Sequence, residues 1–247
     1  SVNKRRENKE QIEAFLLIAP ALLFMLVFTV FPIFRSVYLS LCKYKMGMHR
    51  PEFIGLQNYQ KLFTSKLFWK VMRNTIVFAL ITVIPSMLGG LGLAVLVKQK
   101  GKHIGFIRTA YFYPCVMPMI AIASVWMFIY MAKNGLWDQI VMSFGGKPMN
   151  VLSNKNTVLP AMAVMYIWKE AGYLMVFFLS GMQAISTELI EAAKIDGANS
   201  WMIFKKITIP LLAPTFLFVS TIAFTNSFKL VDHVVIMTEG APNNAST

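Results

Sequence analysis

Charged side chains are scarce in this sequence. They make up 14% of the 247 residues, whereas an average soluble domain has about 25%. Hydrophobic residues make up 56%, above the usual share. A soluble chain with so little charge would leave much of its surface apolar, so the composition argues against a water-soluble domain.

Side chains that carry chemistry are also few. The sequence has no H-E-x-x-H, no G-x-S-x-G and no G-x-x-x-x-G-K-[ST], so it offers no zinc protease site, no serine nucleophile and no ATP phosphate cradle. Its cysteines and histidines match no metal or redox spacing: Cys42, Cys115, His49, His103 and His233. We therefore predict no catalytic residue, no metal and no cofactor.

What the sequence does contain is long uncharged runs. Four are unbroken, and a fifth is interrupted only by Lys169 and Glu170. A hydrocarbon core of about 30 Å needs about 20 helical residues, and lipid offers no partner to an unpaired backbone group. Buried helices of soluble proteins usually have shorter apolar runs. We predict transmembrane helices at about residues 12–35, 74–98, 107–132, 158–185 and 207–229.

The first run also has features of a signal peptide, because basic residues precede it. It is long for that role, contains Pro20 and Pro32, and is followed by Arg35-Ser36-Val37 rather than a small-x-small cleavage site. We interpret it as a retained span.

The net charge of +13 comes from basic residues that lie between the runs. In a soluble protein this charge would suggest nucleic acid, but no nucleic-acid motif is present, and anionic lipid headgroups explain it. Positive residues occur in similar numbers on both sides of the predicted spans, so charge alone does not determine orientation.

The segments between the runs differ in character. Apolar residues recur at helical spacing among lysines over 56–73, which predicts an interfacial amphipathic helix. Residues 98–108 are a basic turn, and residues 133–157 are a polar loop marked by Asn134-Gly135 and Gly145-Gly146. Prolines and glycines within the second and third runs predict kinks or close helix contacts.

The segment 186–206 is too polar to span a membrane. Ser186 or Thr187 can cap a helix whose first turns carry acidic residues, and Gly197 permits a sharp turn. A second short helix, 199–206, then leads to Pro210, whose fixed φ suits the start of the next span. On these grounds alone, an ordinary loop between spans explains the segment as well.

The spacing in this segment resembles a known signature. Glu191-Ala192-Ala193, three residues, Gly197, nine residues and Ile207-Thr208-Ile209-Pro210 resemble the E-A-A-x3-G-x9-I-x-L-P motif of permease subunits in binding-protein-dependent ABC importers. Ile209 replaces leucine, and Ile185-Ser186 stands where the family has Ile-Pro.

Other stretches are similar to the carbohydrate-uptake branch, the permeases for maltodextrins, multiple sugars and glycerol phosphate. Phe53–Tyr59 fits F-x-G-L-x-N-Y, Asn74-Thr75 opens the second span, and Glu191–Ala198 fits E-A-A-x-I-D-G-A. Asp232 and Thr238–Pro242 resemble the branch's T-x-G-G-P region. The family has a sixth span after this motif, so five visible spans of six are expected.

The resemblance implies an all-α polytopic helical bundle, one permease domain over 1–247, in a bacterial-type inner membrane. Its partners would be two ABC ATPase subunits, a second permease chain and an external solute-binding protein. Residues 186–206 would be the cytoplasmic coupling loop, with ATPase docking through Glu191, Ala192, Ala193, Asp196 and Gly197. The chain would then translocate a sugar or sugar-like solute, with residues 42–73 and 133–157 outside.

Two alternatives stay open. An ion-coupled secondary transporter would need paired intramembrane acids, and apart from Glu170 none is visible. A membrane enzyme or structural subunit lacks supporting motifs.

The charged pair Lys169 and Glu170 has two interpretations. A charge at the bilayer centre costs about 2.5–3.5 kcal/mol on insertion scales, so such residues usually face a cavity or a partner. They either line the solute path or pair across the permease interface, or the span begins later and they lie near the outer headgroups. Asn226 and Ser227 are weaker candidates for the path, since polar residues there also join helices.

Overall fold

The computed structural model describes residues 2–44, 50–98 and 104–229, with side chains from residue 10 onward. The chain forms two compact units, residues 1–69 and 70–247, and each is described by itself. The single domain over 1–247 stays a prediction. Asp232 and Thr238–Pro242, which resemble a sugar-permease motif, lie outside the described residues.

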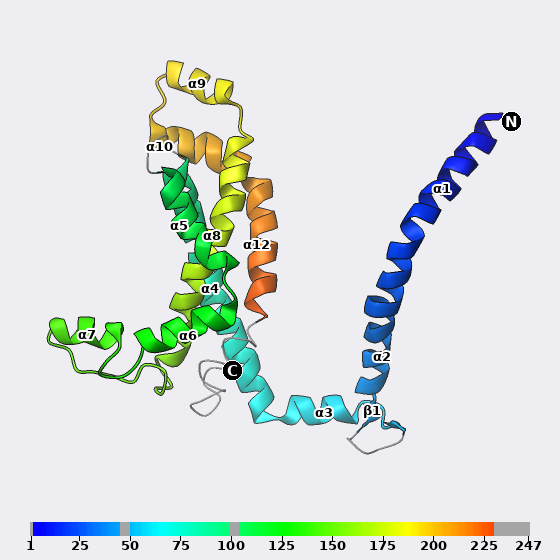
Figure 1. The fold of residues 1–247 in the computed structure, drawn as a ribbon, viewed down its shortest axis with the longest axis horizontal. Coiled ribbons are helices and arrows are strands. Elements are labelled where there is room, and N and C mark those ends of the chain that lie inside the picture. Colours follow the sequence, from blue (N-terminus) through cyan, green and yellow to red (C-terminus); the bar gives the residue numbers. More distant parts are fainter. Residues whose placement is uncertain (1, 45–49, 99–103, 230–247) are drawn as a thin grey trace. The chain divides into compact units, whose positions relative to one another are not determined.

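The first unit begins with a long helical rod made of three consecutive segments: α1 (Val2–Met25), the π-helical turn η1 (Leu26–Val30) and α2 (Phe31–Ser40) (Figure 1). Residues 10–40 have the length and apolarity of a membrane span and include the predicted span 12–35. The π turn lies directly before Phe31-Pro32. Since proline has no N–H to donate, the wider bond from Phe31 N–H to the Leu26 carbonyl keeps the helix continuous there.

Two short strands and a helix follow the rod: β1 (Cys42–Lys43), β2 (Glu52–Phe53) and α3 (Gln57–Thr64). The strands pair antiparallel. The Asn58 side-chain amide donates to the carbonyls of Ser40 at 2.8 Å and Cys42 at 2.9 Å, and the Tyr59 hydroxyl lies 2.8 Å from the Ser40 hydroxyl. Gly55, at φ +60°, makes the turn between β2 and α3. The F-x-G-L-x-N-Y motif therefore ties the end of α2 to the start of α3.

The amphipathic pattern predicted over residues 56–73 is divided between two helices. α3 ends at Thr64, Ser65 is extended at ψ 121°, and α4 (Lys66–Val97) begins at the next residue. Leu67 and Val71 therefore belong to α4, and this helix starts at Lys66 rather than at residue 74. The reason is that apolar residues at helical spacing continue from the amphipathic stretch straight into the second apolar run.

The second unit contains the C-terminal part of α4 and the remaining helices: α5 (Ile104–Val116), α6 (Met119–Ile129), α7 (Leu136–Ser143), α8 (Val158–Gln183), α9 (Thr187–Ile195), α10 (Ser200–Ile203), η2 (Phe204–Thr208), α11 (Ile209–Leu211) and α12 (Ala213–Ser227). Figure 1 shows α4, α5 and α12 running alongside α8, with α9 and α10 at one end. Among the described residues, three helices are long and apolar enough to cross a membrane, or up to five if each bent pair counts as one span.

Both bent pairs overlap predicted spans. The predicted span 107–132 is formed by α5 and α6, and the helix axis bends by 103° between them, at Met117-Pro118. In the last span, one helical segment runs from Ser200 to Leu211 and meets α12 at 66°. Helix α12 begins at Ala213 with Pro214 in its first turn, so Pro214, rather than the expected Pro210, opens the last span.

Helix α8 lies at the centre of this unit and is packed closely by small residues. A side chain at Gly90 of α4 would place its Cβ 2.9 Å from the Leu174 Cβ and 3.1 Å from the Ala171 carbonyl. A Cβ at Gly172 would overlap the Tyr111 carbonyl of α5. Glycine lets these backbones approach within contact distance, as is usual where membrane helices pack.

Two apolar clusters lie along α8, one toward each end. The first joins Val158–Tyr166 of α8 to α4 and α6, and the second joins Leu174–Met182 to α4 and α12. Lys169 and Glu170 fall between the clusters. The polar pair therefore occupies an interruption in the hydrophobic packing.

A pair of glycines on α4 tests the close approach. Replacing glycine by alanine within a helix favours folding by roughly 0.5–1 kcal/mol. Gly92→Ala should show this gain, because a Cβ at Gly92 would have no atom of another side chain or helix within 4 Å. Gly90→Ala should instead lose stability, because overpacking costs about 1–3 kcal/mol. Thermal unfolding of the detergent-solubilised variants measures both; equal midpoints for Gly90→Ala and Gly92→Ala would contradict the packing.

Candidate functional sites: an exposed helical hairpin and a polar cavity

The hairpin of α9 and α10 closes with a recognised helix-ending geometry. Helix α9 begins after Ser186, whose side chain makes no capping hydrogen bond, and ends at Ile195. The Gly197 N–H donates to the Lys194 carbonyl at 3.1 Å, and the Ala198 N–H donates to the Ala193 carbonyl at 2.9 Å. This pair of bonds is a Schellman motif, which needs a left-handed residue after the helix. Gly197 supplies it at φ +84°.

The spacing from Ala193 to Gly197 follows from this motif. The carbonyl that accepts the hydrogen bond from Ala198 belongs to Ala193, the third residue from the helix end, and the left-handed residue stands four positions later. Asn199 then starts the second helix, and its side chain accepts a hydrogen bond from the Met202 N–H at 2.8 Å. The expected end of this helix at residue 206 is wrong, because helical structure continues to Leu211.

A second π turn explains this continuation. Turn η2 lies directly before Ile209-Pro210, and the Ile209 N–H donates to the Phe204 carbonyl. The wider turn lets the helix pass Pro210, as η1 does before Pro32. The hairpin is thus joined to the bend before α12 by one uninterrupted helical segment.

The outward side of α9 is partly apolar. Glu188, Glu191, Ala192 and Ile195 share one helical stripe and are exposed, and Ile195 is 86% exposed. On the opposite side, Ile190 packs against the second apolar cluster. The outward side of α9 therefore presents Ile195 beside the carboxylates of Glu188 and Glu191.

Not all predicted docking residues share that stripe. Ala193 is half-buried, while Asp196 and Gly197 are exposed in the turn. The small side chain that faces outward is therefore Ala192, and Ala193 serves the turn through its carbonyl.

The second site is a cavity of about 310 Å³ beside the middle of α8. Three of the four predicted path residues line it: Lys169, Glu170 and Asn226. Eleven residues of α8 precede Lys169 and thirteen follow Glu170. The pair therefore lies at the middle of the helix, which favours the cavity interpretation over a position near the helix end.

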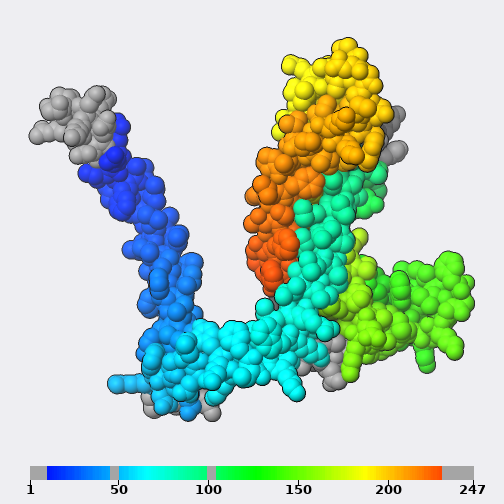
Figure 2. All heavy atoms as spheres, turned by 180° about the vertical axis from the view of Figure 1, so that it is seen from behind, coloured from blue at the N-terminus to red at the C-terminus, as the bar shows by residue number. Residues whose placement is uncertain are grey.

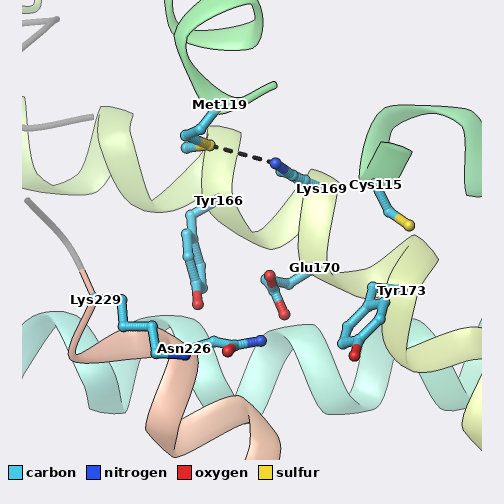
Figure 3. A pocket seen from close by; sticks show the side chains of 8 residues that line it. All are labelled: Cys115, Met119, Tyr166, Lys169, Glu170, Tyr173, Asn226 and Lys229. Atoms are coloured by element: carbon cyan, nitrogen blue, oxygen red, sulfur yellow. Dashed lines mark hydrogen bonds between the residues drawn. The ribbon is translucent and has the colours of Figure 1, made fainter. Parts of the chain in front are cut away.

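The two neighbouring charges point in different directions (Figure 3). The Lys169 ammonium donates to the Met117 carbonyl at 3.2 Å and lies 3.7 Å from the Met119 sulfur. These atoms belong to the break between α5 and α6, where a carbonyl loses its helical partner. A cation at the C-terminal end of a helix is also favoured by the helix dipole.

The Glu170 carboxyl faces the other wall of the cavity. Figure 3 shows it on the side of the Asn226 side chain of α12. Its Oε2 atom is buried and has no hydrogen-bond partner among the described residues. A buried acceptor that faces a cavity is available to a ligand hydroxyl or to water.

Ser227 does not belong to this site. Its side chain is fully buried and its hydroxyl donates to the Phe224 carbonyl at 2.8 Å, within its own helix. The remaining lining residues were not predicted from the sequence: Cys115, Met119, Tyr166, Tyr173 and Lys229. A signal was present for the tyrosines, because positions 166, 170 and 173 lie on one face of a helix.

No group of three or more His, Cys, Asp or Glu side chains in the described part of the chain could hold a metal ion. The cavity is lined by hydrogen-bonding groups and by the aromatic rings of Tyr166 and Tyr173.

Known proteins resemble this chain over most of its length. A family model described as "Binding-protein-dependent transport system inner membrane component" matches residues 86–244. The chain is 34% identical to the probable starch degradation products transport system permease protein AmyD of Thermoanaerobacterium thermosulfurigenes, over 98% of this chain and 82% of AmyD. It is 28% identical to the trehalose/maltose transport system permease protein MalF of Thermococcus litoralis, over 100% of this chain and 84% of MalF.

Solved structures show the same fold. A chain of a bacterial ABC transporter involved in the import of the acidic polysaccharide alginate aligns with a TM-score of 0.83 at 19% identity, over 99% of this chain and 83% of that one. A second structure of a bacterial alginate ABC transporter, in complex with an alginate pentasaccharide-bound periplasmic protein, aligns equally well at 18% identity.

The two cysteines test the cavity directly. Cys115 lines it and is partly exposed, whereas Cys42, in β1, is 3% exposed. Brief treatment of the folded protein with N-ethylmaleimide should therefore modify Cys115 and spare Cys42, and denatured protein should take up two labels. Peptide mass spectrometry measures this, with Cys115→Ser as the control. Equal labelling of both thiols in the folded protein would contradict the cavity.

Proposed function

This chain belongs to the family of binding-protein-dependent transport system inner membrane components, so it is a permease subunit of an ABC importer in the inner membrane, and we propose that it translocates a sugar or sugar-like solute. Relatives named for starch products, trehalose and maltose, and lactose support this solute class. The alternative of an ion-coupled secondary transporter gains no support from the family match.

The observation that carries the proposal is the ordered, exposed hairpin of α9 and α10. We propose that it is the cytoplasmic coupling loop and docks an ABC ATPase, with one ATPase for each of two permease chains. Glu191 would offer its carboxylate to an arginine or to backbone N–H groups, a contact worth roughly 1.5–3 kcal/mol. Ala192 would let the partner approach the helix backbone, and Asp196 and Gly197 would set the angle between the two helices.

This docking defines the proposed orientation. With the hairpin in the cytoplasm, the N-terminus and residues 98–108 are inside, and 42–73 and 133–157 are outside. An external solute-binding protein would then deliver solute to the outer side, as the periplasmic protein in the alginate transporter complex suggests by analogy.

We propose that the solute passes the cavity beside α8. Glu170 and Asn226 offer a carboxyl and an amide to solute hydroxyls, and the tyrosine rings form apolar walls of the kind that sugar faces pack against. Lys169 is directed to the Met117 carbonyl and holds the break that shapes the cavity. Ser227, which is buried within its own helix, is left out of the path.

Variants in the hairpin test the docking. Ala192→Trp should insert normally into the membrane but weaken ATPase binding tenfold or more, equivalent to about 1.4 kcal/mol, because the ring blocks close approach. Gly197→Pro should do the same, because proline fixes φ near −65° and removes the N–H that donates to Lys194. Co-purification of the ATPase and ATP-dependent uptake in vesicles measure the effect.

The matched control adds the same ring to an exposed loop residue, Ser153→Trp, before α8. This variant should retain both ATPase and uptake. If Ala192→Trp and Gly197→Pro also retain both, the docking assignment is wrong.

Adjacent residues of α12 test the solute path. Asn226→Ala removes a cavity group and should raise the apparent KM for uptake severalfold, as should Glu170→Gln, while Ser227→Ala should leave transport unchanged. Membrane abundance and ATPase co-purification serve as controls for folding and assembly. Unchanged uptake kinetics in both Asn226→Ala and Glu170→Gln would argue that the solute does not contact this cavity.

A further inference from the structure

Helix α7 has an exposed apolar side. Leu136, Ile140 and Phe144 recur at a spacing of four residues and are 58%, 47% and 88% exposed, and Trp137 beside them is 45% exposed. Gln139 and Ser143, on the adjoining side, are exposed as well. The outward surface of α7 is therefore amphipathic, a pattern that the prediction of a polar loop over 133–157 overlooked.

A buried carboxylate fixes the conformation that presents this side. Asp138 is 2% exposed and accepts hydrogen bonds from the Lys133 N–H at 2.7 Å and the Met149 N–H at 3.2 Å. One side chain of α7 thus holds the backbone before and after the helix. The apolar side is consequently presented by an ordered segment and is not the by-product of a loose loop.

The exposed side of α7 continues a surface that faces lipid. The 103° bend after α5 turns the chain away from the direction of the span, and α7 follows α6 (Figure 1). Ile120, Val125 and Phe128 of α6 are each more than half exposed. In an inner membrane protein such apolar side chains of a spanning pair meet acyl chains, and Figure 2 shows α7 (green) standing out to the side of the other helices of its unit.

The charge of the loop matches a phospholipid surface. Lys133, Lys147 and Lys155 are exposed, and the only carboxylate in residues 133–157, Asp138, is buried. All outward-facing charge is therefore positive. Anionic headgroups attract such lysines by about 1 kcal/mol each near the surface.

We propose that α7 lies in the membrane interface, with Leu136, Trp137, Ile140 and Phe144 in the acyl-chain boundary and the loop lysines at anionic headgroups. A short helix with an aromatic and aliphatic side and basic flanks has the properties of an interfacial anchor. Because α7 lies between α6 and α8 in the chain, this contact would hold the end of α6 and the start of α8 at the membrane surface. It is independent of the proposed function; only the side of the membrane rests on the docking of α9.

Spin labels on the assembled transporter test the proposal. A nitroxide is attached at Ile140→Cys, or at Gln139→Cys as the matched control, with Cys42 and Cys115 replaced by serine, and the complex is reconstituted in vesicles of phosphatidylcholine and phosphatidylglycerol. Collision rates with oxygen, which concentrates in lipid, and with a water-soluble nickel chelate are compared. The label at 140 should favour oxygen severalfold over the label at 139.

Lipid charge provides a second measurement. The label at 140 should lie deeper in vesicles that contain phosphatidylglycerol than in phosphatidylcholine alone, and Lys133→Gln with Lys147→Gln should reduce this difference. Equal exposure of both labels to the nickel chelate would overturn the proposal. A label at 140 that is aqueous at rest and becomes immobilised only when the solute-binding protein is added would overturn it in favour of a protein-docking surface.

Discussion

A backbone group in hydrocarbon must find a partner within the protein, and the irregular points of this chain follow from that constraint. Pro32 and Pro210 lack the N–H that would continue a helix, and each is preceded by a π turn whose wider hydrogen bond carries the helix past it. At the break between α5 and α6, the Met117 carbonyl loses its helical donor and receives the Lys169 ammonium instead. The same accommodation recurs at the C-terminal end of α8, where the Lys98 ammonium donates to the Met182 carbonyl at 3.4 Å. Lysines thus serve here as donors to helix ends as well as charges.

The position of the cavity follows from this accommodation. Helix α8 can be approached closely by α4 and α5 because Gly90 and Gly172 carry no side chain. Apolar clusters form on either side of the middle of α8, and Cys115 and Met119, on the two sides of the break between α5 and α6, line the cavity. Lys169, at the middle of α8, donates to the carbonyl at this break, and the adjacent Glu170 is turned toward α12. Binding groups and helix-stabilising groups are therefore consecutive residues of one helix.

The sequence predicted the features that depend on short separations along the chain. Uncharged runs located the helices, and the spacing of Glu191 to Gly197 predicted a hairpin with a sharp glycine turn, which the positive φ of Gly197 confirms. It could not predict the separation of Asn226 from Ser227, because which of two neighbours faces α8 depends on the rotation of α12. The length of α10 was also misjudged, since a proline normally interrupts a helix and the π turn before Pro210 gives no recognisable signal in composition. Helix α7 was overlooked because glycines and asparagines on both sides suggested a loop.

The helical segment from Ser200 to Leu211 is one piece, and it meets α12 at an angle of 66°. At 1.5 Å per residue this segment is about 18 Å long. A tilt of this segment by about 10° about the bend at Leu212 would move its Ser200 end by roughly 3 Å. Leu212 is fully buried against α8, whereas Ser200 at the opposite end of the segment is exposed beside the turn that follows α9. The exposed hairpin and α12, the helix that carries Asn226 at the cavity, are therefore joined through a single bend.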